Sequence, residues 1–321
     1  MKSTWVRSAA RALLVAAPLF AALALPGARA AEPLKVIVPW GAGGSSDTFA
    51  RTLALSMRET LGREIVIINK PGAAGTLGTT LVAQAEPDGN TIGFSALAPF
   101  TMQPHLRKLA YDADSFAYVC EPAASPMVLA VRDESPFKSV ADAVTFAAAN
   151  PGKLKYGSPG PGSLPHLAMV ELGLKAGVKW THLPAKGGDM GNVRNLLGGH
   201  IDMVPIQILP LASNPIRALA VFSDARLDDL KDVPTMKELG YDVSHVIWNA
   251  MVAPKGTPEA KLAEFEAACQ TAAATPAYKA LLKKVRVPDT FKGRAALTAY
   301  AKAESDKFKV LFEQAGMKKK D

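Results

Sequence analysis

Residues 34–62 read LKVIVPWGAGGSSDTFARTLALSMRETLG, and this stretch decides the fold. Residues 34–39 are a short apolar run rich in β-branched side chains, which predicts a strand. A glycine-rich turn follows. Beyond it, large apolar residues recur at helical spacing until Gly62: Phe49, Leu53, Met57 and Leu61. The stretch therefore predicts a strand, a loop and a helix, in that order.

The same order repeats in both directions along the chain. Residues 65–68 and 91–95 predict two further strands, and residues 77–85 carry apolar side chains at helical spacing between them. After apolar runs at 118–121 and 127–131, helices and strands alternate again, in segments 139–149, 154–157, 165–176, 180–183, 190–197 and 201–206. Such alternation specifies parallel sheets covered by helices, with right-handed crossovers.

The length of the chain favours two lobes, each large enough to bury its own core. Later strands at 216–222 and 247–252 precede helices at 258–274, 277–284 and 294–314, which we expect to return to the first lobe. We therefore predict an α/β fold in which residues 31–131 and 247–321 form lobe 1 and residues 132–246 form lobe 2. A hinge made of two segments permits closure around a ligand.

The first 30 residues have the plan of a secretory signal. Basic residues precede an apolar run at 12–25, and Ala28-Arg29-Ala30 favours cleavage after Ala30. The run is shorter than the ~20 residues that span a bilayer, so a permanent anchor is the weaker alternative. We therefore predict a secreted, soluble protein, and we expect a monomer.

The charge of the chain is mildly positive. Cleavage removes four basic residues and no acidic one, which lowers the net charge from +8 to +4. No basic stripe is interleaved with aromatic residues, which argues against nucleic acid as a partner. A mild positive charge instead raises the encounter rate with anions. The basic residues 318–320 are typical of a solvated, frayed end.

Two cysteines, Cys120 and Cys269, lie far apart in a chain bound for an oxidising compartment. The sequence allows a disulfide between them but does not require one. There is no CxxC pair and no HExxH motif, and the five histidines do not pair at metal-ligand spacing. We therefore expect neither a metal site nor a cofactor.

Two loops at the ends of predicted strands favour an anion. Residues 41–47 (GAGGSSD) and 69–76 (NKPGAAGT) each lie between a strand and a helix, where free backbone N–H groups and the helix dipole attract negative charge. Neighbouring parallel strands end on one edge of the sheet, so the two loops converge. Ser46 or Asp47 is also expected to cap the first helix. The dinucleotide fingerprint fails at Ser46, and no P-loop motif occurs.

A third loop, residues 156–163 (YGSPGPGS), precedes a helix that Pro165 can open. The hydroxyls of Ser158 and Ser163 are candidates to donate to the same ligand from lobe 2; a turn-rich loop with a serine cap is the alternative. Ser163 and His166 lack the GxSxG elbow and an orienting acid, so catalysis is the weaker interpretation. His166 packs behind the loop or contacts the ligand, and Trp40 covers a ligand face or packs as core.

Seven motifs together resemble the substrate-binding receptors of tripartite tricarboxylate transporters, the Bug receptors. They span nearly the whole chain after residue 30: VPWGAGGSSDTFAR at 38–51, NKPGAAGTLG at 69–78, AEPDGNTIGF at 85–94, YGSPGPGSLPHLA at 156–168, LLGGHIDM at 196–203, RALAV at 217–221 and APKGTP at 253–258. The resemblance implies a type II periplasmic binding protein (Venus flytrap) fold that passes its ligand to membrane permease subunits, and no enzymatic activity.

The resemblance also implies a ligand set. Two loops would act as pincers on a ligand carboxylate, partly through ordered waters, with the second lobe and Thr101 completing the cleft. By position, the first pincer would hold Gly43, Gly44, Ser45 and Asp47, the second Ala73 and Ala74, and the second lobe Ser158, Gly162 and Ser163.

Three departures from the family pattern fall near the variable end of the pocket. Where such receptors usually read PYKGGAPA, residues 184–191 read PAKGGDMG, which loses a Tyr and gains Asp189. Asp189 meets a ligand amine or caps the following helix; the sequence leaves both open. Asn90 stands where an aromatic residue is common, and Asn249 replaces the aromatic residue of a Trp-aromatic-Gly motif.

Three functions remain in competition. The leading hypothesis is a receptor for a small carboxylate, because backbone donors give charge-assisted hydrogen bonds without any side chain that must turn over. A ligand-sensing subunit for a signalling partner is the alternative. An enzyme on the same fold, using Ser163, His166 and Asp189 or Asp202, is the third. A mono- or dicarboxylate, an amino acid or an aromatic acid would each satisfy the pincers.

Overall fold

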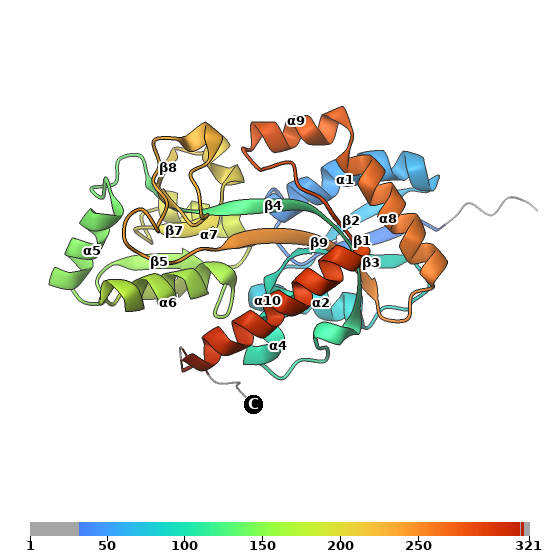
Figure 1. Cartoon of the computed structure of the whole chain (residues 1–321), viewed down its shortest axis with the longest axis horizontal. Coiled ribbons are helices and arrows are strands. Elements are labelled where there is room, and N and C mark those ends of the chain that lie inside the picture. Colours follow the sequence, from blue (N-terminus) through green and yellow to red (C-terminus); the bar gives the residue numbers. More distant parts are fainter. Residues whose placement is uncertain (1–31, 315, 318–321) are drawn as a thin grey trace, which may run out of the picture. The chain divides into compact units, whose positions relative to one another are not determined.

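The computed structural model describes residues 32–314 and 316–317 (Figure 1). The predicted signal segment and the basic residues 318–320 lie outside these ranges. The residues of these two ranges cluster as one compact unit. The division into two lobes at residues 131 and 247 stays a prediction.

The opening stretch folds as its pattern predicts. Strand β1 (Leu34–Val38) leads through the first loop into helix α1 (Ser45–Leu61), which ends at Gly62 in the left-handed conformation. Strands β2 (Ile65–Asn69) and β3 (Thr91–Ala96) both pair with β1 in parallel, and helix α2 (Thr76–Ala83) connects them.

Successive residues of β1 face opposite sides of the sheet, which gives the molecule two cores. Val36 packs with Phe49 of α1, whereas Ile37 belongs to the cluster that holds Val82 of α2 and Trp248. This alternation is the period-two geometry of a strand that is covered on both faces.

Two long antiparallel strands run through the centre of the molecule (Figure 1). Strand β4 (Phe116–Arg132) pairs with β9 (Val246–Pro254) along its first part and with β7 (Val204–Gln207) and β8 (Ile216–Val221) along its last part. The sequence analysis treats this stretch as two separate apolar runs, residues 118–121 and 127–131, whereas the structure has one continuous strand. Pro122 lies where the pairing register shifts, and such a bulge tolerates a residue without an N–H group.

The middle of the chain alternates as predicted, with boundaries displaced by a few residues. Strands β5 (Lys155–Ser158) and β6 (Thr181–Pro184) pair in parallel. Three helices connect or flank these strands: α5 (Val140–Ala149), α6 (Leu164–Ala176) and α7 (Gly188–Leu197).

The last helices pack back onto the first part of the chain. Helix α8 (Glu259–Ala273) contacts α1 and β4, and α10 (Arg294–Gln314) contacts β4. The remaining elements are short or peripheral: α9 (Pro276–Lys284), α3 (Ala98–Thr101), α4 (Gln103–Leu106), β10 (Lys292–Gly293), and the 3-10 helices η1 (Ala73–Gly75), η2 (Ala113–Ser115), η3 (Leu209–Ala212) and η4 (Asp228–Leu230).

A disulfide joins Cys120 of β4 to Cys269 of α8, with 6.6 Å between their Cα atoms. The sequence left this bond open. It closes a loop across 149 residues of sequence, and such a long loop gives a stabilisation of about 2–5 kcal/mol in the chain-entropy account.

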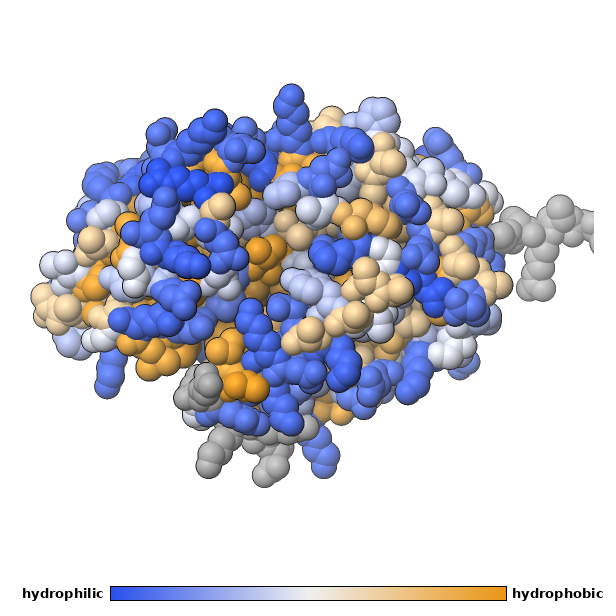
Figure 2. Space-filling view, in the orientation of Figure 1, coloured by the Kyte–Doolittle hydropathy of each residue, from blue (hydrophilic) through white to orange (hydrophobic). Residues whose placement is uncertain are grey.

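Polar side chains cover most of the face shown in Figure 2, with apolar groups scattered among them. Within residues 32–314, none of the helices combines the length and the apolar composition that crossing a bilayer requires.

Candidate functional site

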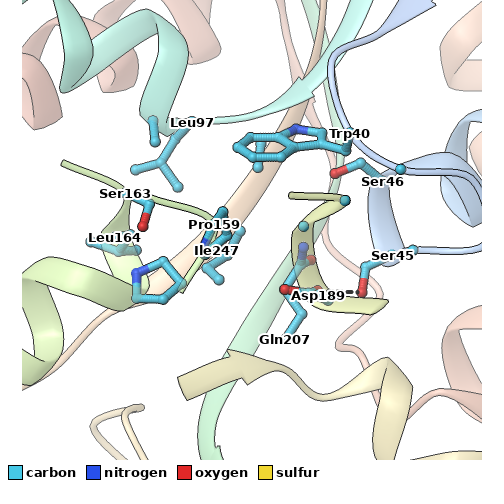
Figure 3. Close-up of a pocket in the computed structure, with 17 residues that line it drawn as sticks. Trp40, Ser45, Ser46, Leu97, Pro159, Ser163, Leu164, Asp189, Gln207 and Ile247 are labelled. Carbon is cyan, nitrogen blue, oxygen red and sulfur yellow. Dashed lines mark hydrogen bonds between the residues drawn. The ribbon is translucent and has the colours of Figure 1, made fainter. Parts of the chain in front are cut away.

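A small cavity, called the inner cavity below, lies where the first turns of three helices meet (Figure 3). Residues 44–46 of α1, 163–165 of α6 and 187–189 of α7 line it, and its volume is about 40 Å³, room for about three water molecules. A helix N-terminus presents unpaired N–H groups and the positive end of the helix dipole. Three such ends around one space favour an anion there.

Asp47 organises the first loop rather than facing this cavity. Its buried carboxylate accepts hydrogen bonds from the N–H of Gly43, the amide of Asn69 and Nε of Arg51, each at 2.9 Å. Burial raises the pKa of Asp47, but these donors, Arg51 foremost, outweigh it and hold the pKa below its ordinary value. Asp47 therefore stays ionised and holds the loop in one shape.

Helix α1 begins without a side-chain cap. Gly44 is the N-cap residue and no side chain bonds to the first turn there, so the expectation that Ser46 or Asp47 caps this helix is wrong. Ser46 instead donates its hydroxyl to Oδ1 of Asn249 at 2.6 Å. The N–H groups of the first turn have no intrahelical partner and are available to a ligand.

The first loop approaches the start of α7 closely at Gly41. A Cβ atom on Gly41 would lie 2.7 Å from the carbonyl oxygen of Gly187, which is closer than real Cβ contacts. Only glycine permits this approach. The contact closes one side of the inner cavity.

Trp40 both lines the inner cavity and packs against its surroundings. Its indole Nε1 donates to Oγ of Ser95 at 2.9 Å, and a Cβ on Gly75 would lie 3.0 Å from the indole ring. The second loop thus supports the ring from behind. Trp40 is half-buried and keeps one part of its surface for the cavity, as Figure 3 shows.

The second loop lines a separate, larger space, called the outer pocket below, with a volume of about 310 Å³. Ala73 and Ala74 have φ angles of 48° and 56°, a left-handed conformation that is strained for residues other than glycine. Arg107 and Lys186 also line this pocket. Backbone strain clusters at ligand sites, and the two cations favour an anion at this entrance.

The serine hydroxyls of the third loop hold the loop together. Ser163 Oγ donates to the carbonyl of Gly160 at 2.8 Å and accepts from the N–H of His166, which makes Ser163 the N-cap of α6. Ser158 Oγ lies 2.7 Å from Nε2 of His182. The serine cap that the sequence offered as the alternative for Ser163 is therefore present, and Ser163 also lines the inner cavity.

Two histidines stack behind this loop on the ring of Tyr156. The ring centres of His166 and His182 are 4.5 Å apart, and Nδ1 of His166 accepts from the N–H of Gly162 at 3.3 Å. Burial lowers the pKa of His166 to about 4; burial, and next the neighbouring His166, lower the pKa of His182 to about 4. Both rings are neutral at pH 7 and pack as supports of the loop.

Asp189 presents a buried carboxylate to the inner cavity. It accepts a hydrogen bond from Ser45 Oγ at 3.1 Å and one from the backbone N–H of Gln207. Burial raises the pKa of Asp189 to about 6, and these two donors only partly oppose the shift. The N-cap of α7 is Gly187, without a side-chain cap, so the alternative that Asp189 caps this helix is wrong.

Two of the three departures from the family pattern meet at one end of the inner cavity. Asn249 of β9 donates to Oε1 of Gln207 at 3.2 Å, and the N–H of Gln207 donates to Asp189. Asn90 lies elsewhere, where it bonds to Arg63 and Asp88. The replacement of an aromatic residue by Asn249 and the gain of Asp189 therefore belong to one polar network.

The predicted ligand residues fall into three groups. Five line the inner cavity: Trp40, Gly44, Ser45, Ser163 and Asp189. Two more, Ala73 and Ala74, line the outer pocket, which Trp40 also borders. The others line neither space: Gly43, Asp47, Thr101, Ser158, Gly162 and His166. Thr101 donates its hydroxyl to the carbonyl of Leu97, and the other five belong to or support the loops. Their role as ligand contacts stays a prediction.

Sequence reasoning missed several residues that line the inner cavity, among them Ser46, Gln207 and Ile247. Gln207 ends strand β7, and ligands of α/β sheets bind at the carboxyl ends of strands. That rule would have found Gln207. No local signal marks Ile247, because its place depends on the pairing of β9 with β4.

No group of three or more His, Cys, Asp or Glu side chains within residues 32–314 and 316–317 is placed to hold a metal ion.

Comparison with known proteins gives a consistent family likeness. Residues 49–317 match the family described as "Tripartite tricarboxylate transporter family receptor". A relative from Cupriavidus necator, named "UPF0065 protein in gbd 5'region", is 32% identical over 292 residues, covering 90% of this chain and 89% of the relative.

Two solved structures extend the likeness to the fold. The periplasmic binding protein BugD is 33% identical with a TM-score of 0.84, covering 90% of this chain and 99% of BugD. MatC from Rhodopseudomonas palustris, solved with bound malate, is 28% identical with a TM-score of 0.81, covering 87% of this chain and 98% of MatC. The α/β fold of periplasmic binding proteins, expected from the sequence, is therefore confirmed as the fold class. The expectation of mainly parallel sheets is wrong, because the long strand β4 and strand β9 pair antiparallel with their neighbours.

Proposed function

The chain belongs to the tripartite tricarboxylate transporter receptor family, and from this we propose that it captures a small carboxylate in the inner cavity and delivers it to transporter subunits in the membrane. The family consists of periplasmic solute receptors rather than enzymes. The predicted signal at residues 1–30 would place this chain in the periplasm with them.

The convergence of α1, α6 and α7 on the inner cavity carries the proposal. Each helix points its first turn at the same small space, and none of the three N-cap residues there is a carboxylate: Gly44, Ser163 and Gly187. A ligand carboxylate would accept hydrogen bonds from the free N–H groups in the first turns of α1 and α7 and gain from the dipoles of all three helices. In α6 the N–H of His166 already donates to Ser163, and Pro165 has no N–H. MatC, a solved structure with malate, supports a carboxylate as the ligand class.

Selective stabilisation by carboxylates tests the proposal. A thermal-shift screen would compare a panel of small carboxylic acids with their amides. A ligand at 100 times its dissociation constant stabilises the folded state by ~2.7 kcal/mol. We expect acids to raise the melting temperature and the matched amides to leave it unchanged. Equal shifts by acids and amides, or no shift by any acid, would contradict the proposal.

A variant at the point of close approach sharpens the test. Gly41→Ala places a Cβ against Gly187, so the first loop and α7 can no longer meet. We expect this variant to fold but to lose at least tenfold in carboxylate affinity. Ala42→Ser is the matched control, because Ala42 is exposed and lines neither the inner cavity nor the outer pocket.

A further inference from the structure

The inner cavity has an acidic end as well as an anion-binding one. Asp189 is 8% exposed and reaches the cavity from the first turn of α7 (Figure 3). A buried carboxylate normally pairs with a cation or collects several donors. Asp189 therefore places an acidic side chain inside a cavity that we propose binds an acidic ligand.

Asp189 has few partners for a group so buried. One hydroxyl, from Ser45, and one backbone N–H, from Gln207, donate to it. An ionised carboxylate has about four acceptor positions, so it can take further donors. Ser45 and Gln207 supply two donors, which leaves room for one supplied by a ligand.

The charged groups on the surrounding elements do not neutralise Asp189. On α1, Asp47 and Arg51 pair with each other. On the segment of Asp189 itself, Lys186 lines the outer pocket and Arg194 lies beside Gly187. None of these cations is among the groups that shift the pKa of Asp189.

The neighbours of Asp189 hold this end of the cavity polar. Ser46 donates to Asn249, and Asn249 donates to the side-chain oxygen of Gln207. This chain of hydrogen bonds fixes the carboxamide of Gln207, the residue whose backbone N–H donates to Asp189. An apolar or aromatic ligand tail would lie against this polar network without satisfying it.

We propose that the ligand carries a protonated amine as well as a carboxylate, and that Asp189 binds the amine. The carboxylate would lie among the N–H groups of the helix first turns, and the ammonium group would donate to Asp189. A dicarboxylate would bring its second negative charge against Asp189 and be rejected. The ligand class is therefore a small amino acid. This inference rests on the proposed function.

A simpler role for Asp189 is to join α1 to α7 through Ser45. The bond between them spans 144 residues of sequence and would form whenever the cavity closes. In that role Asp189 would support every ligand equally. Selectivity between ligands of one shape and different charge separates the two roles.

Three sets of ligands with matched carbon skeletons test the inference by calorimetry on the purified protein. Each set holds an amine, a neutral methyl analogue and a dicarboxylate: β-alanine, butyrate and succinate; 4-aminobutyrate, valerate and glutarate; L-alanine, isobutyrate and methylmalonate. We expect at least one amine to bind ten or more times tighter than the other two members of its set. If carboxylates bind but no amine is preferred in any set, the inference is overturned and the proposed function survives. If no member of any set binds, both fail.

Asp189→Asn removes the charge and keeps the shape. We expect this substitution to lower the affinity for the preferred amine 10- to 100-fold and to change the affinity for its methyl isostere by less than threefold. If Asp189→Asn lowers the affinities for the amine and for its methyl isostere equally, and Ser45→Ala does the same, then Asp189 serves only to join α1 to α7. The inference is then overturned. Asp224→Asn, the same change at an exposed acid, is the charge control.

Discussion

The first turns of α1 and α7 each hold a buried aspartate, and the pKa values of the two aspartates are shifted in opposite directions. Asp47 and Asp189 are 2% and 8% exposed. The pKa of Asp47 lies below its ordinary value, whereas that of Asp189 rises to about 6. Burial opposes ionisation in both. The difference comes from the partners: Asp47 has Arg51, whereas Asp189 has no cation.

The comparison separates a structural acid from a candidate binding acid. The carboxylate of Asp47 is saturated by donors that shape the first loop, so it has little left for a ligand. Asp189 bears an uncompensated burial penalty, and strongly perturbed acids in a cavity are candidates for function. Each prediction below alters one member of this pair.

The largest effect is expected from Asp47→Ala. The substitution leaves the N–H of Gly43 without its acceptor and Arg51 without its counter-ion, and it removes one of the two acceptors of the Asn69 amide. The free energy of unfolding should therefore fall by about 2–4 kcal/mol. Urea denaturation at pH 7 measures this. Asp47→Asn keeps one acceptor oxygen, so its free energy of unfolding should lie between those of the unsubstituted protein and of Asp47→Ala. A loss under ~0.5 kcal/mol would show that Asp47 does not hold the first loop in its shape.

Asp189→Asn should stabilise the ligand-free protein at pH 8. Because the folded-state pKa of Asp189 is raised, the stability that its neutral form contributes is present below about pH 4 and is lost as the pH rises through about 6. Asparagine never ionises, so the gain should reach about 1–3 kcal/mol at pH 8 and vanish near pH 4. Denaturation at both pH values measures it. An equal change at both would contradict the pKa shift.

The affinity for an amine ligand should fall as Asp189 becomes protonated. Between pH 8 and pH 5 we expect a loss of about tenfold, or about 1.4 kcal/mol, because the neutral acid no longer attracts the ammonium group. His166 and His182 titrate near pH 4 and remain neutral through this range. Titration calorimetry at several pH values measures the loss. A methyl isostere that loses as much would assign the effect to another group.

The smallest effect is expected from Ser45→Ala. Asp189 loses the one side-chain donor that it has among the described residues, which should raise its pKa further and destabilise its ionised form by about 0.5–1.5 kcal/mol. Carbon-detected titration of the Asp189 carboxyl group by NMR measures the pKa directly. A downward or absent shift would show that Ser45 does not stabilise the charge.

Much of the fold followed from local patterns. The run at residues 34–62 predicted β1, the first loop and α1 because strand and helix periodicities are properties of a few neighbouring residues. The continuous strand β4 was missed because prolines at 122 and 126 break the local pattern. Its pairing with β9, β7 and β8 holds it together instead.

The candidate site was predicted in part. Glycine-rich loops after strands identified Gly44, Ser45 and Ser163, since the chemistry of a loop before a helix is local. Asp189 was noticed only as a departure from a family pattern, with its role open. The disulfide between Cys120 and Cys269 was likewise left open, because sequence spacing carries no information about the distance between β4 and α8.

The sequence by itself determined the alternation of strands and helices, the family and the loops that favour an anion. Only the tertiary structure decided which polar groups share one cavity. Ser45, Asp189 and Gln207 are brought together from three separate elements. The pKa of a buried acid depends on its solvation and on the charges within a few ångströms, and both are set by packing between residues far apart in the chain.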